Sequence, residues 1–92
     1  MPRPKKWRWV AFSPQVTYFK PQGIPLRVLS QVVLTVDELE ALRLADLEGM
    51  SQEEAAQRMK VSRPTFGRIV AQARKRVADA LVNGRAIQVQ GG

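Results

Sequence analysis

Basic, hydroxyl and amide side chains recur at short spacing between residues 60 and 76, a combination suited to binding nucleic acid. Arg can donate two hydrogen bonds to a guanine edge, and Thr can contact a thymine methyl group or a phosphate. The residues expected to lie at or near bases are Arg63, Thr65, Arg68 and Gln72. The residues expected to contact phosphates are Lys60, Arg74, Lys75 and Arg76.

Two short helices joined by a tight turn are expected to position these side chains. Ser51 is a good N-cap, and Glu54 three residues later completes a capping box. Ser62 caps the next helix, and Pro64 lies in its first turn, where a missing N–H costs little. The spacing is that of a DNA-binding helix-turn-helix, whose second helix enters the major groove. The side chains expected to pack between the helices are Ala55, Ala56, Met59, Val61, Phe66, Ile69 and Val70.

The charge of the 92-residue chain favours a polyanionic partner. Fifteen basic and eight acidic residues give a net charge of +7 and a pI near 10.9. Residues 1–35 carry six bases and no acid, residues 36–54 carry seven acids and one base, and residues 55–92 carry eight bases and one acid. Because the bases gather on the expected recognition helix and its flank, nucleic acid is favoured over a membrane surface.

Composition also excludes several functions. The chain has no His and no Cys, so the usual catalytic bases, nucleophiles and zinc ligands are absent. We therefore expect no enzymatic activity, no metal and no cofactor. No apolar run approaches the ~18 residues of a membrane span, which predicts a cytoplasmic protein.

The pattern predicts a mainly α fold in a single domain, with three principal helices at about 36–48, 52–59 and 63–82. Residues 1–6 form a basic arm, 7–34 an N-terminal strand and Pro/Gly-rich segment, 35–83 the helical core, and 84–92 a C-terminal strand or tail. Thr35 and Glu38 should cap the first helix, and Gly49 should end it in a left-handed conformation. A partly apolar face is expected at Leu39, Leu42, Arg43, Asp46 and Leu47, widened by Ala41 and Leu44.

The chain ends are expected to contribute a short β element. Residues 85–90 alternate in polarity but are too few to be stable alone, and the segment Trp7–Phe12 is the obvious pairing partner. Residues 26–33 fit either a short helical turn or an apolar connector. The buried stripe of the last helix is expected at Phe66, Ile69 or Val70, Ala73, Val77, Ala80 and Leu81.

The span LTVDELEALRLADLEGMSQEEAAQRMKVSRPTFGRIVAQARKRVADAL resembles the helix-turn-helix of sigma-factor region 4. The whole chain resembles more closely the UPF0251 (DUF134) family of small predicted DNA-binding proteins of bacteria and archaea. The matching signatures are VTYFKPQGIPL at 16–26, LEALRLADLEGMSQEEAAQRMKVSRPTFGRI at 39–69 and VADALVNGRAI at 77–87. Lys60 stands where such turns usually have Gly, and the family's N-terminal cysteines are missing. The resemblance implies DNA binding, but no redox or metal role at the N-terminus.

These observations predict sequence-selective binding of double-stranded DNA by a transcriptional regulator, with a homodimer as one way to reach useful specificity. Two alternatives stay open. The acidic first helix could dock on the transcription machinery, making the domain a protein-interaction module. The aromatic and basic arm could bind RNA. The candidate arm contacts are Arg3, Lys5 and Lys6.

Overall fold

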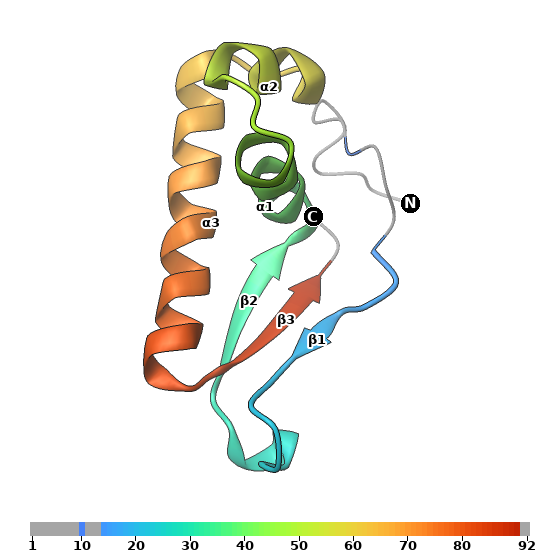
Figure 1. Cartoon of the computed structure of the whole chain (residues 1–92), viewed down its shortest axis with the longest axis vertical. Coiled ribbons are helices and arrows are strands. Elements are labelled where there is room, and N and C mark those ends of the chain that lie inside the picture. The colour runs from blue at the N-terminus through green and yellow to red at the C-terminus, as the bar shows by residue number, and fades with distance from the viewer. Residues whose placement is uncertain (1–9, 11–13, 91–92) are drawn as a thin grey trace.

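The computed structural model describes residue 10 and residues 14–90 (Figure 1). Its elements follow in the order β1 (Tyr18–Phe19), η1 (Leu26–Val28), β2 (Gln31–Thr35), α1 (Val36–Leu42), η2 (Arg43–Leu47), α2 (Gln52–Met59), α3 (Arg63–Asn83) and β3 (Ala86–Gln90). Three helices and a small three-stranded sheet confirm the mainly α class predicted from the sequence. None of the helices among these residues is long and apolar enough to cross a membrane.

Capping side chains define where the helices begin. Thr35 accepts a hydrogen bond from the Glu38 backbone N–H, and the Glu38 carboxylate accepts one from the Thr35 N–H, which is a complete capping box. Ser51 and Ser62 cap α2 and α3 by accepting from the N–H groups of Glu54 and Thr65. These local signals explain why the predicted helix starts agree with the observed ones to within a residue.

The first helix changes its winding after the seven residues of α1, which are about two turns. The segment η2 is a π-helix, in which the Glu48 N–H donates to the Arg43 carbonyl oxygen at 2.8 Å. Gly49 then ends it with a φ of 75°. The chain has no Pro or Gly between Thr35 and Gly49 that would signal this widening, and the sequence predicted a single helix over about 36–48.

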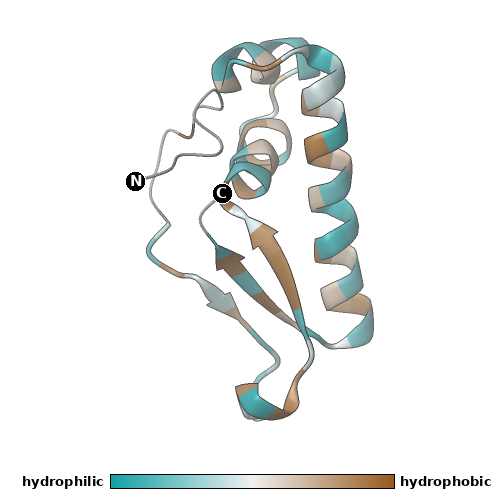
Figure 2. Ribbon diagram, turned by 180° about the vertical axis from the view of Figure 1, so that it is seen from behind, coloured by the Kyte–Doolittle hydropathy of each residue, from teal (hydrophilic) through white to brown (hydrophobic). Residues whose placement is uncertain are grey.

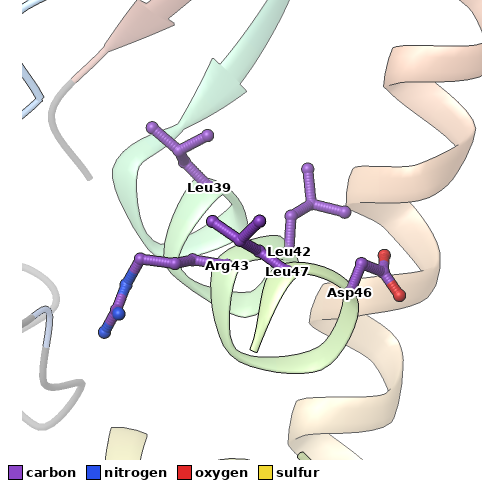
Figure 3. A pocket seen from close by; sticks show the side chains of 5 residues that line it. All are labelled: Leu39, Leu42, Arg43, Asp46 and Leu47. Carbon is purple, nitrogen blue, oxygen red and sulfur yellow. The ribbon is translucent and has the colours of Figure 1, made fainter. Parts of the chain in front are cut away.

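The buried face of α1 and η2 contains acidic as well as apolar residues. Its members are Asp37, Glu38, Glu40, Ala41 and Leu44, whereas Leu47 is 78% exposed. A surface hollow of about 480 Å³ is lined by Leu39, Leu42, Arg43, Asp46 and Leu47 (Figure 3), and Leu42 also packs against the core. The five residues expected to share a partly apolar face do line one hollow, and Ala41 and Leu44, which were expected to widen it, are buried in the core.

The sheet has the order β1-β3-β2 and joins both ends of the described chain. The strand β3 runs parallel to β2, with Val32 opposite Ile87, and antiparallel to β1, with Phe19 opposite Ile87. Both edges of β3 are thus occupied, by β1 and β2 rather than by the partner that the sequence predicted. The predicted partner Trp7–Phe12 falls outside the described residues except for Val10.

The helix α3 is the longest element and packs against both the other helices and the sheet (Figures 1 and 2). Its N-terminal half packs on α1 and α2, and its C-terminal half lies beside the sheet. The main core contains Ala41, Leu44, Ala55, Ala56, Met59, Phe66, Ile69 and Val70. Leu81 was predicted to be buried but is 75% exposed, because α2 and η2 do not extend that far along α3.

Candidate nucleic-acid interface

The unit α2–turn–α3 is held by a tight turn at Lys60 to Ser62. Lys60 has φ 58° and ψ 44°, the left-handed conformation expected for the position where related turns carry Gly. Its N–H donates to the Gln57 carbonyl at 3.1 Å, and the Val61 N–H donates to the Ala56 carbonyl at 3.0 Å. The turn therefore closes the end of α2 and starts α3 within three residues.

Buried side chains fix the rotation of α3 about its axis. Phe66 is fully buried, Val70 nearly so, and Ile69 is 8% exposed. Successive residues of an α-helix are turned by about 100°, so these contacts determine which side chains face outward. The predicted site residues consequently divide among three faces of the helix rather than forming one surface.

Arg68 and Lys75 lie on the outermost face of α3, opposite the buried stripe. Both are exposed, and within the described part of the chain no ion pair involves either of them. Arg68 Nη2 donates to Thr65 Oγ1 at 3.2 Å, which draws its side chain along the helix surface. This face carries two exposed cations that have no ion pair with another described residue.

Thr65, Gln72 and Arg76 lie on the flank of α3 that faces the start of α1. A groove of about 350 Å³ runs there between the two helices. Its lining residues are Thr35, Asp37, Glu38, Thr65, Arg68, Ile69 and Gln72. The side of the groove formed by α1 carries two acidic residues, Asp37 and Glu38. Both are nearly buried, with exposed fractions of 3% and 8%, and both belong to the hydrogen-bond network that caps α1.

Arg76 connects this flank to the sheet. Its Nη1 donates to the Val33 carbonyl oxygen at 3.1 Å, and its Nε lies 3.4 Å from Glu38 Oε2. When its amide is oriented to satisfy its neighbours, the Gln72 oxygen accepts from Arg76 Nη2 at 3.0 Å. A phosphate contact, which the sequence suggested for Arg76, would have to compete with these bonds.

Arg63 and Arg74 lie on the opposite flank, toward α2 and η2. Arg74 forms a two-point ion pair with Asp46, with Nη2–Oδ1 at 2.7 Å and Nε–Oδ2 at 3.1 Å. The hydrogen bond from Arg74 holds the pKa of Asp46 below its ordinary value of 3.8. Arg63 is exposed and has no ion pair with any other described residue.

The acidic cluster of the first helix is mostly internal. Glu40 is 1% exposed, and the Arg43 guanidinium donates to its carboxylate through Nε at 2.8 Å and Nη2 at 3.0 Å. That hydrogen bond raises the pKa of Arg43. Asp37 and Glu38 are buried like Glu40, so these three acids are not available at the surface. A ladder of i,i+3 partners, such as Glu40 with Arg43, is the signal that could have shown this.

A spacing of three residues also links side chains at the start of α3, a connection that the sequence did not predict. Ser62, Thr65 and Arg68 follow one another at intervals of three, and their side chains are joined by hydrogen bonds. The candidate arm contacts Arg3, Lys5 and Lys6 fall outside the described residues.

Fold and site together define a small, mainly helical domain whose long helix α3 presents a basic outer face. The family profile described as "Protein of unknown function DUF134" matches residues 1–92. The chain belongs to this family, as its sequence signatures predicted.

Curated relatives carry the name UPF0251 protein. That of Caldanaerobacter subterraneus subsp. tengcongensis is 68% identical over 92 residues, covering 100% of this chain and 78% of the relative. That of Thermoanaerobacter pseudethanolicus is 65% identical, with the same coverage of both chains. That of Desulfosudis oleivorans is 64% identical over 100% of this chain and 67% of the relative. No solved structure matches the chain significantly.

Proposed function

We propose that the protein binds double-stranded DNA selectively by sequence and acts as a transcriptional regulator. The observation that carries this proposal is the orientation of α3 about its own axis. Phe66 and Val70 face the core, and Arg68 and Lys75 face outward on the helix that follows the tight turn. A single helix of this kind fits the major groove, with its N-terminal residues nearest to the base edges.

The described residues support distinct roles for the basic groups. Arg68 and Arg63 lie in the first two turns of α3, where side chains can reach base edges. Lys75 and Lys60 lie at either end of this stretch and are exposed, a placement suited to phosphates. Arg76 and Arg74 serve mainly to hold α3 against β2 and η2, through Val33 and Asp46.

The burial of the acids bears on the protein-docking alternative. Glu38 and Glu40 are 8% and 1% exposed and are engaged with Arg76 and Arg43. Reversal of their charges would place a cation at a buried position beside Arg43 or Arg76 and should destabilise the fold. Charge reversal therefore tests docking of the first helix only at exposed acids such as Glu48.

Specificity from one reading helix is limited, because a single domain covers only a few base pairs. We propose that two copies act together on DNA, and exchange of terminal strands is one route to such a dimer. In the described chain β3 is already paired with β1 and β2, so exchange would have to replace these contacts. Light scattering that detects only monomer at micromolar concentration, with and without DNA, would contradict a dimer.

The test is selection of sequences from random double-stranded DNA at two salt concentrations. If about five basic side chains contact phosphates, log affinity should fall with log salt at a slope of about −4 to −5. The variant Arg63→Ala/Arg68→Ala should lose the enriched sequence.

Removal of Arg68 alone, in the variant Arg68→Ala, has Arg27→Ala as its matched control. Arg27 is also exposed but lies in η1, far from α2 (Figure 1). The control variant should retain the sequence preference. Salt-dependent binding without an enriched sequence would indicate a non-specific binder. No binding even at low salt would refute the proposal and favour a protein-docking role.

A further inference from the structure

The hydroxyl of Thr65 lies at the centre of a hydrogen-bond chain on the exposed surface of α3. Ser62 Oγ donates to Thr65 Oγ1 at 2.9 Å, and Arg68 Nη2 donates to the same oxygen at 3.2 Å. The Thr65 N–H in turn donates to Ser62 Oγ at 3.2 Å, so Ser62 is held as the N-cap. Thr65 is thereby fixed by the helix start and itself restrains Arg68.

This arrangement changes what both side chains can offer to a ligand. A hydroxyl has two acceptor lone pairs and one donor hydrogen, and both lone pairs of Thr65 Oγ1 are engaged. Only its hydrogen remains, so Thr65 can approach an acceptor but not another donor. Arg68 keeps four of its five N–H donors, while its side chain has fewer rotamers to lose on binding.

Geometry distinguishes Arg68 from the other arginines of α3. It lies on the outermost face of the helix, whereas Arg76 is engaged with Val33 and Glu38, and Arg74 with Asp46. Arg63 lies on the flank toward α2. Arg68 is therefore the arginine that is both accessible and held in orientation.

We propose that Arg68 reads a guanine and that Thr65 is its positioning residue, an inference that rests on the DNA binding proposed above. Guanine offers two acceptors, O6 and N7, to the planar fork of Arg in the major groove. Thr65 holds that fork in a reading orientation before DNA arrives and directs its remaining hydrogen toward an acceptor on the DNA.

The test compares Thr65→Val, Thr65→Ser, Arg68→Ala and the double variant Thr65→Val/Arg68→Ala. The probe is the site selected by the unaltered protein, together with a set of its single-base-pair substitutions. Thr65→Val keeps the shape of the side chain and the hydrogen bond from the backbone N–H to Ser62. Circular dichroism is used to check that each variant is folded. Thr65→Ser keeps the hydroxyl.

Arg68→Ala should abolish the preference for guanine at one position, a loss of about 10- to 100-fold. Thr65→Val should weaken the same preference about 3- to 10-fold, the range for one hydrogen bond, while the salt slope stays unchanged. Thr65→Ser should behave like the unaltered protein. In the Arg68→Ala background Thr65→Val should cause no further loss at that base pair.

The inference is overturned if Thr65→Val leaves the Arg68-dependent preference intact, weakens all positions equally, or adds its full effect to that of Arg68→Ala. In each of these cases the protein still selects a sequence, so the proposed function stands. An unaltered protein that enriches no sequence would overturn the proposed function and this inference together.

Discussion

Arg76 and Lys75 are adjacent in the sequence, yet the structure predicts that removal of Arg76 lowers the stability of the fold, whereas removal of Lys75 affects DNA binding. Arg76→Ala removes a charged donor from the Val33 carbonyl of β2 and leaves Glu38, which is 8% exposed, without its cation. A hydrogen bond from a charged group contributes about 1.5–3 kcal/mol. Because 37% of the Arg76 side chain is exposed and solvent screens the interaction, we expect a loss near or below the lower end of that range, about 1–2 kcal/mol.

Thermal denaturation followed by circular dichroism measures this difference. For a domain of this size 1 kcal/mol shifts Tm by about 4–8 °C, so Arg76→Ala should melt about 5–15 °C lower than the unaltered protein. Lys75→Ala should change stability by less than about 0.5 kcal/mol, as expected for an exposed residue. On DNA, Lys75→Ala should reduce the salt slope by about 0.9, the value of one phosphate contact.

Arg76→Lys provides the control, because it keeps the positive charge but loses the planar fork. It should recover only part of the lost stability. The reasoning would be refuted if Arg76→Ala melted like the unaltered protein and reduced the salt slope as much as Lys75→Ala. Arg76 would then be a phosphate contact, as the sequence suggested.

Three further predictions concern stability. Lys60→Gly should raise the free energy of unfolding by up to about 1 kcal/mol in chemical denaturation, because Gly adopts the left-handed conformation freely. The same change should weaken DNA binding, because it removes a cation. A lower stability would contradict the argument that Lys60 is strained. Thr35→Ala should cost about 0.5–2 kcal/mol by breaking the capping box, whereas unchanged unfolding would show that α1 does not need its cap. The pKa values of Asp46 and Asp79 are lowered by hydrogen bonds from Arg74 and Asn83, so their stabilisation is present above the ordinary pKa of 3.8 and is lost as pH falls below it. Melting curves of Asp46→Asn should accordingly depend less on pH below about 4 than those of the unaltered protein, and an equal dependence would rule out this contribution.

Much of the helical architecture could be predicted because its signals are local. Thr35, Ser51 and Ser62 accept from the N–H groups three residues ahead, and such caps can be identified without knowing the rest of the fold. The left-handed positions Lys60 and Gly49 are equally local. The inward face of α3 at Phe66, Ile69 and Val70 followed from helical periodicity.

The strands could not be predicted with the same success. Residues 26–33 fitted either a short helical turn or an apolar connector, and the structure has the short helix η1 at Leu26–Val28 followed by β2 at Gln31–Thr35. The strand was not predicted, since five residues carry little periodic signal. This segment becomes a strand only because β3, more than fifty residues later, lies beside it in parallel. Leu81 shows a related effect: its place on the edge of the apolar stripe suggested burial, but burial needs a neighbouring element.

The sequence by itself determined the family of the chain, the positions of its helices and the set of basic residues from which an interface could be formed. Only the tertiary structure decided which members of that set remain accessible. Val33 and Glu38 engage Arg76, Asp46 engages Arg74, and Thr65 holds Arg68 on the outer face. The first three partners lie on other elements and reach α3 only when the chain folds, and no local pattern encodes such contacts.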